Sequence, residues 1–146
     1  MLTQAQLTLL KADILADPVL SAQPNNSDGA FAIAEAYNLL AVPDFWVWRT
    51  DVSQSEIVGA TSPDATVWSW SIYISRSQGE RDGWREMFAD RGSINAALPN
   101  VRQGLNDIFY GPSGAAQRTH LLAMGRRRAL RAEKLFASGT GTTIAP

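Results

Sequence analysis

The sequence lacks cysteine and contains a single histidine, His120, among its 146 residues. Without cysteine the chain forms no disulfide, thiolate metal site or thiol nucleophile, and one histidine gives little support to a histidine metal site or a catalytic triad. We interpret His120 as a structural side chain, either partly buried or exposed, rather than as a general base. The sequence therefore predicts a protein that is not an enzyme and that needs no cofactor or metal ion.

Long hydrophobic runs are also missing from the sequence. The longest apolar runs are a few residues long, whereas a helix that crosses a bilayer needs about 20. The first fifteen residues lack a basic leader and a long apolar segment, so we expect no secretory signal. The sequence thus predicts a chain that is made and folded in the cytoplasm and has no membrane partner.

The composition is that of a globular domain. Hydrophobic residues make up 45% of the chain and charged residues 18%, which is enough apolar material for a packed core. A chain of this length suits one domain better than two. We predict a single helical domain over 1–137, followed by an extended C-terminal arm over 138–146 whose small and β-branched residues have little to bury. An ordinary frayed terminus is the alternative for that arm.

Hydrophobic periodicity and capping signals predict most of the chain to be helical. Thr3 is an expected N-cap, and the segments that begin at Ser53 and Ser77 each fit a capping box. Gly111-Pro112 ends one helix before the last begins. The expected helices cover about 3–16, 28–40, 53–60, 78–90, 99–110 and 113–137.

Two segments have the character of strands. Residues 45–52 are rich in aromatic and β-branched side chains, and 67–75 alternate between large apolar and mostly small polar residues. Together they predict a two-stranded hairpin that rests on helices, packed by most of the five tryptophans, although tryptophans also anchor interfaces. The predicted fold class is mainly α, a helical bundle of about five helices with a small β-hairpin and an extended C-terminal arm.

Charge is distributed unevenly along the chain. Residues 111–146 contain six basic residues and one acidic residue, a net charge of +5, whereas 1–110 contain seven basic and thirteen acidic residues, a net charge of −6. Such separation suits docking to an acidic neighbour or to another copy, although a solvated helix face has the same signature. The candidate partner-binding residues are Arg126, Arg127, Arg128, Arg131 and Lys134 on the expected last helix, with Ser138, Gly139, Thr140, Gly141, Thr142, Thr143 and Ile144 in the arm.

Four stretches together resemble small structural proteins of tailed bacteriophages. They are 26–34 (NSDGAFAIA), 45–50 (FWVWRT), 77–82 (SQGERD) and 131–141 (RAEKLFASGTG). None of them is a chemical motif, so the likeness rests on their order and spacing over most of the chain, and it is weakest over 59–74. Within that setting the chain is similar to head–tail connector (neck) proteins of the adaptor type.

This resemblance implies a mostly helical subunit of a virion. It would form a homo-oligomeric ring of about 12 copies around the DNA channel, bind the portal protein and a downstream neck or tail protein, and touch packaged DNA without sequence specificity. Its location would be the head–tail junction, after assembly in the host cytoplasm. Two alternatives stay open, which are another neck or tail role, such as tail terminator or head decoration, and a nucleic-acid-binding regulator that uses the arginine-rich segment.

Deletion of 138–146 tests the predicted arm. If the arm docks the subunit, the deletion abolishes attachment to the portal while the thermal unfolding of the subunit stays nearly unchanged, because these residues have little to bury. Attachment is measured by co-sedimentation with portal rings, and unfolding by circular dichroism. A truncated chain that still attaches contradicts the arm hypothesis.

Overall fold

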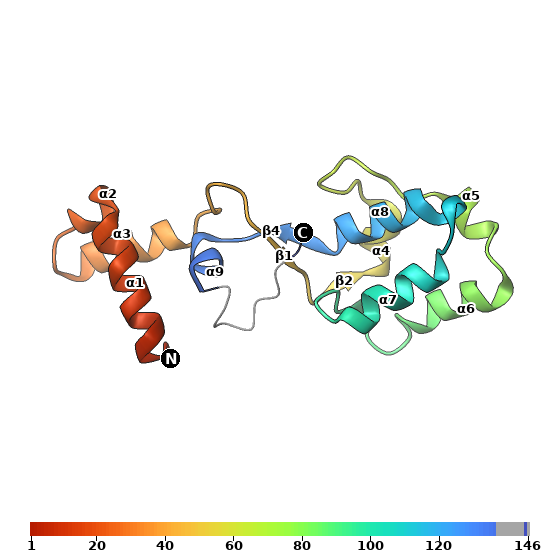
Figure 1. Cartoon of the computed structure of the whole chain (residues 1–146), viewed down its shortest axis with the longest axis horizontal. Helices are drawn as coiled ribbons and strands as arrows, with labels where there is room; N and C mark the ends of the chain where they lie inside the picture. Colours follow the sequence, from red (N-terminus) through yellow and green to blue (C-terminus); the bar gives the residue numbers. More distant parts are fainter. Residues whose placement is uncertain (137–144, 146) are drawn as a thin grey trace. The chain divides into compact units, whose positions relative to one another are not determined.

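A computed structural model of the chain describes residues 1–136 and 145. The chain divides into two compact units (Figure 1). Within the described residues, unit 1 consists of 1–46 and 128–136, and unit 2 consists of 47–127 and 145. The predicted single domain over 1–137 stays a prediction. No helix of the described part is both long enough and apolar enough to cross a membrane.

Unit 1 joins three helices from the start of the chain to one helix near its end. These are α1 (Gln4–Ala16), α2 (Pro18–Ser21), α3 (Ser27–Tyr37) and α9 (Arg131–Phe136). Between α3 and α9 two extended segments exchange backbone hydrogen bonds: Ala41 N–H donates to Ala129 O (2.9 Å), and Ala129 N–H donates to Phe45 O (2.7 Å). The N-terminal and C-terminal segments of unit 1 are therefore held together by main-chain contacts.

Unit 2 contains the remaining helices and most of the core. The helices are α4 (Gln54–Gly59), α5 (Trp70–Ile74), α6 (Gln78–Glu86), α7 (Pro99–Ile108), the short 3-10 helix η1 (Pro112–Gly114) and α8 (Ala115–Met124). The strands β2 (Val52–Ser53) and β3 (Ser93–Ile94) pair antiparallel. The strands β1 (Trp46–Trp48) and β4 (Arg126–Arg128) also pair, and the division between the units passes through both. The mainly α fold with a small β element is confirmed.

The core of unit 2 is aromatic. Trp84 and Phe109 are fully buried, and Trp68 packs on both rings with centroid distances of 5.0 Å and 5.9 Å. Phe88 adds an edge contact to Trp84 at 4.8 Å. Trp68 and Trp84 thus pack in the interior, but not as part of the predicted hairpin, and Trp70 is more than half exposed.

Local capping signals identified most helices correctly. Thr3, Ser53 and Ser77 each complete a capping box, in which the N3 backbone N–H donates to the cap hydroxyl and the N3 side chain accepts from the cap N–H. The expected helices at 3–16, 53–60, 78–90 and 99–110 are found as α1, α4, α6 and α7. Helix α3 is also found, with Asn26 rather than Ser27 or Asp28 as its cap.

The strand predicted over 67–75 is wrong. Residues 70–74 form α5, whose first turn is capped by Ser69. The Ser69 backbone N–H donates to the side chain of Gln117 (2.9 Å), not to a neighbouring strand. The predicted hairpin partner of 45–52 is therefore replaced by β4, because β1 pairs with residues that lie far along the chain.

The single last helix predicted over 113–137 is also wrong. Helix α8 ends at Met124, and the carbonyl of its C-cap, Gly125, accepts from the backbone N–H of Arg49 (2.8 Å). The next residues, 126–128, are extended because they pair with β1, and a new helix, α9, begins at Arg131. A tertiary strand pairing thus overrides the helical pattern of the sequence.

His120 is fully buried in unit 2 and holds an irregular segment in place. Its Nε2 lies 2.8 Å from the Ile57 carbonyl, and its Nδ1 lies 3.0 Å from Thr66 Oγ1. In the neutral ring Nε2 donates to the carbonyl, so Nδ1 accepts from the threonine hydroxyl. The Thr66 hydroxyl also lies 2.6 Å from Ser62 Oγ. His120 was predicted to be partly buried or exposed, whereas its burial is complete and both ring nitrogens have partners.

We expect His120→Ala to lower the free energy of unfolding by about 2–4 kcal/mol, because it opens a cavity and leaves the Ile57 carbonyl and the Thr66 hydroxyl without their ring partners. Urea unfolding followed by circular dichroism measures the change. Thr119→Ala is the matched control, since Thr119 is exposed on the same helix. Equal losses in the two variants would contradict the proposed role of the ring.

Candidate functional site

The basic residues predicted to dock a partner belong to two units. Arg126 and Arg127 lie in unit 2, whereas Arg128, Arg131 and Lys134 lie in unit 1. The first three are in strand β4 and the last two in α9, so they do not form one face of one helix. The arm residues 138–144 lie outside the described part of the chain, and their predicted role stays a prediction.

In unit 2 the basic segment borders an open hollow of about 490 Å³. Arg49, Arg126 and Arg127 line it together with Asp51 and Glu56. Arg126 forms an ion pair with Asp64, with Nη2 and Oδ2 2.7 Å apart. The hollow therefore combines three guanidinium groups with carboxylates that already neutralise part of their charge.

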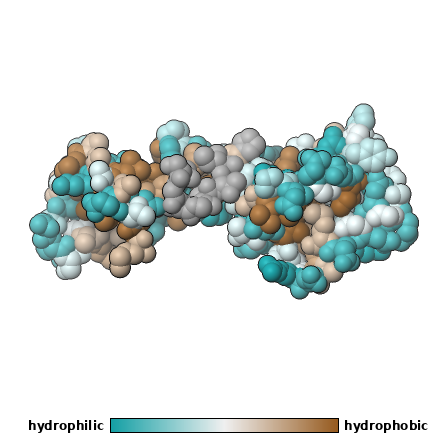
Figure 2. Space-filling view, turned by 60° about the horizontal axis from the view of Figure 1, so that its bottom comes forward, coloured by the Kyte–Doolittle hydropathy of each residue, from teal (hydrophilic) through white to brown (hydrophobic). Residues whose placement is uncertain are grey.

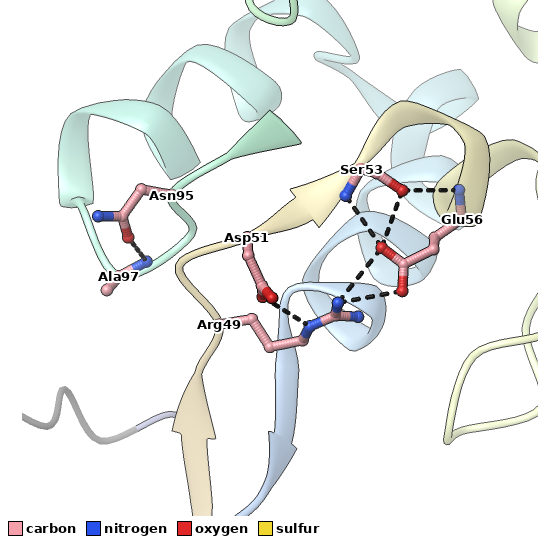
Figure 3. A network of polar contacts seen from close by, with 6 residues as sticks. All are labelled: Arg49, Asp51, Ser53, Glu56, Asn95 and Ala97. Atoms are coloured by element: carbon pink, nitrogen blue, oxygen red, sulfur yellow. Dashed lines mark hydrogen bonds and ion pairs between the residues drawn. The ribbon is translucent and has the colours of Figure 1, made fainter. Parts of the chain in front are cut away.

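Arg49 connects the two acidic residues of this hollow (Figure 3). Its Nη2 lies 3.0 Å from Glu56 Oε1, and its Nε lies 3.5 Å from Asp51. The Ser53 backbone N–H and hydroxyl also donate to Glu56, and together with Arg49 they lower the pKa of its carboxyl. These contacts hold the segment between β1 and α4 in place. The polar groups of Arg49, Asp51, Ser53 and Glu56 interact with one another.

In unit 1 the basic residues contact acidic or carbonyl groups of the N-terminal segment. Arg128 pairs with Asp44, and the Lys134 Nζ donates to the Pro43 carbonyl (3.2 Å). Arg131 Nη2 lies 2.9 Å from Asp13, and its Nη1 lies 2.9 Å from Asp17. These contacts use the cations to bind α9 and β4 to residues 13–44 of the same unit.

Arg131 is the centre of a half-buried cluster. Its guanidinium lies over the ring of Tyr37 (4.8 Å), and the Tyr37 hydroxyl donates to Asp13. The hydrogen bond from Tyr37 and the pairing with Arg131 lower the pKa of Asp13. Arg131, with the backbone N–H groups of Leu20 and Val19, lowers the pKa of Asp17. Burial and the bond to Asp13 raise the pKa of the Tyr37 hydroxyl to about 12.

A hollow of about 650 Å³ lies beside this cluster in unit 1. Its walls combine the cluster with exposed apolar side chains of the segment after α3, including Leu39, Leu40 and Val42, and with Leu135 of α9. It is half open to solvent rather than enclosed. The described residues offer no group of three or more acidic or histidine side chains that could hold a metal ion.

The sequence analysis did not predict an exposed apolar stripe on helix α1 of unit 1. No residue of α1 is fully buried, although Leu10 and Ile14 turn partly inward. On another face of the helix the apolar residues Ala5, Leu9, Ala12 and Ala16 are exposed. Their spacing of four, three and four residues is that of the contact stripe, or seam, between two packed helices. The same spacing is visible in the sequence, but it can be recognised as a separate exposed stripe only when Leu10 and Ile14 are known to face the interior.

Comparison of the chain with family models, with curated protein sequences and with solved structures gives no match.

We expect Arg131→Gln to make unit 1 less stable at neutral pH and to reduce its sensitivity to acid. Asp13 and Asp17 have pKa values below their ordinary 3.8 in the folded chain, so their stabilising effect is present above pH 4 and is lost as the pH falls through the lowered values. The urea midpoint of wild type should therefore exceed that of the variant at pH 7, with a smaller gap at pH 3.

Lys11→Gln is the control for this comparison, because it removes an exposed cation of unit 1 from outside the cluster. Its urea midpoint should stay close to that of wild type at both pH values. A wild-type advantage over Arg131→Gln that is equally large at pH 7 and pH 3 would show that the ion pairs are not its cause.

Proposed function

We propose that this protein is a structural subunit of a tailed-bacteriophage virion, of the head–tail connector type, that assembles with copies of itself. The resemblance of 26–34, 45–50, 77–82 and 131–141 to such proteins motivates the proposal. In it the chain forms a ring, contacts the portal on one side and a neck or tail protein on the other, and performs no chemistry. Tail terminator and head decoration are the alternatives within the same class.

The observation that carries the proposal is the apolar surface of unit 1. Most of the exposed large apolar side chains of the described chain lie within residues 1–46, and Figure 2 shows such side chains at the surface of this unit. They are Met1, Leu2, Leu7, Leu9, Leu15, Val19, Phe31, Leu39, Leu40 and Val42. A concentration of exposed apolar side chains in one part of a protein is typical of an interaction surface.

Helix α1 gives that surface a specific form. Leu9 is flanked one turn away by Ala5 and Ala12, so the exposed seam is narrow enough for the backbone of a second helix to approach. A neighbouring copy supplies a helix of the same kind, and burial of the seam would add apolar contact that α1 lacks within its own chain. Assembly thus accounts for a helix that has no fully buried residue.

The basic residues of 126–134 are less available for docking than the net charge of this segment suggested. Arg126, Arg128 and Arg131 are paired with carboxylates of their own units. A regulator that binds nucleic acid through this segment would have to break these pairs. The structure therefore offers nothing that favours the regulator over the connector.

Imaging of the assembled particle at side-chain resolution tests the proposal directly. A density for this chain directly beneath the portal supports the connector role, and a density on the head-proximal end of the tail tube or on the capsid surface replaces it with a terminator or decoration role. A chain missing from the particle overturns the proposal.

We expect Leu9→Glu to prevent self-association, because it places a charge on the exposed seam of α1. Gln4→Glu is the matched control, since it adds the same charge to an exposed position of the same helix outside the seam. Mass photometry of both variants at equal concentration, in the presence of portal rings, measures the assembly. Assembly of Leu9→Glu to the wild-type extent would show that the seam is not an interface.

A further inference from the structure

Arg76 is a buried cation in unit 2 without a carboxylate partner. The residue is 7% exposed, and its Nη1 and Nη2 donate to the Tyr110 carbonyl (3.2 Å) and to Ser113 Oγ (2.8 Å). Its Nε has no hydrogen-bond partner. The positive charge of Arg76 helps to lower the pKa of the Glu80 carboxyl. That carboxyl accepts a hydrogen bond from the Ser77 N–H (2.6 Å) and not from Arg76. A buried guanidinium served only by neutral acceptors retains most of its capacity to attract an anion.

Arg118 contacts the same loop. Its Nη1 donates to the carbonyls of Phe109 and Gly111, while its Nε and Nη2 have no acceptor among the described residues. The free edge of a guanidinium, formed by Nε and one terminal nitrogen, matches two oxygens of a phosphate or carboxylate. Neither Arg118 nor Arg76 forms an ion pair with a described carboxylate. Two arginines that form no ion pair with a described carboxylate thus contact the loop formed by residues 109–113.

This loop is a fixed support rather than a loose connection. Gly111 has a φ of 73°, a conformation that favours glycine. At Gly114 a Cβ atom would lie 2.0 Å from the Phe109 carbonyl oxygen, so the backbone passes too close for any side chain. The carbonyl groups to which both arginines donate are therefore positioned by a constrained backbone.

Tyr110 adds an aromatic group to the two cations. Its ring is 64% exposed and lies 5.7 Å from the Arg76 guanidinium. An exposed ring beside cations suits a ligand that has both a phosphate and a flat base, because the base can stack while the phosphate takes the charge. An acidic peptide would use the cations and leave the ring without a partner, so a nucleic acid fits the surface better.

We propose that Arg118, Arg76 and Tyr110 form a binding site for a phosphate group of single-stranded nucleic acid. Arg118 receives two phosphate oxygens through its free edge, Arg76 supplies long-range attraction from below the loop, and Tyr110 stacks on the neighbouring base. The site lies wholly in unit 2, far along the sequence from the apolar seam of α1. It does not depend on the connector proposal.

Fluorescence anisotropy with a labelled 20-nucleotide oligothymidylate at low salt tests the site on the unassembled protein. Arg118→Gln should weaken binding by about tenfold, because a charge-assisted contact to phosphate is lost. Arg91→Gln is the matched control, since it removes an exposed arginine of the same unit from another place. Wild-type binding should weaken as salt rises, with a smaller slope for Arg118→Gln.

A second variant keeps the test decisive if Arg118→Gln does not fold. Tyr110→Ala removes an exposed ring and should weaken the oligonucleotide several-fold while leaving the affinity for inorganic phosphate, measured by calorimetry, unchanged. The proposal is overturned if both variants bind the oligonucleotide as Arg91→Gln does, or if wild type does not bind it at low salt. It is equally overturned if a polyglutamate peptide binds more tightly than the oligonucleotide, because the surface would then belong to an acidic protein.

Discussion

The buried polar face of α8 is the constraint on which unit 2 depends. The segment from 60 to 69 forms neither helix nor strand, so its backbone and hydroxyl groups need partners from elsewhere. Gln117 accepts from the Ser69 N–H, and His120 contacts the Thr66 hydroxyl. Because both side chains lie on one helix face, α8 fixes this irregular segment and also the position of Trp68, whose ring packs on the aromatic core. Without Gln117 and His120, the segment that carries Trp68 would lose the contacts that hold this ring against the core.

The positive charge near the end of the chain has a largely internal use. In unit 1, Arg128 and Arg131 bind Asp44, Asp13 and Asp17, and in unit 2, Arg126 binds Asp64. Exposed pairs of this kind each contribute little to stability, about 0–1 kcal/mol. Arg131, however, also packs on Tyr37 and joins Asp13 of α1 to Asp17, the residue between α1 and α2. The opposite net charges of residues 1–110 and 111–146 therefore reflect contacts within the folded chain as well as any contact with a partner.

Much of the fold could be predicted from local signals, because a capping box such as Ser53–Glu56 is decided within one helical turn. The errors came where distant residues decide the conformation. Alternation over 67–75 indicates a strand, but the strand position beside β1 is taken by Arg126–Arg128, and Ser69 starts a helix instead. The basic residues could be identified from the sequence for the same reason only in part. The sequence shows that arginines are grouped at 126–131, but their carboxylate partners lie far away in the chain and are known only from the fold.

The division of unit 1 between the two ends of the sequence has a consequence for biosynthesis. Residues 1–46 leave the ribosome first, yet the segment that completes them, 128–136, is translated only after the whole of unit 2. At about 5–20 residues per second, the early helices wait for several seconds with their future contact surface uncovered. The surface of unit 1 is therefore completed only after residues 47–127 have been translated.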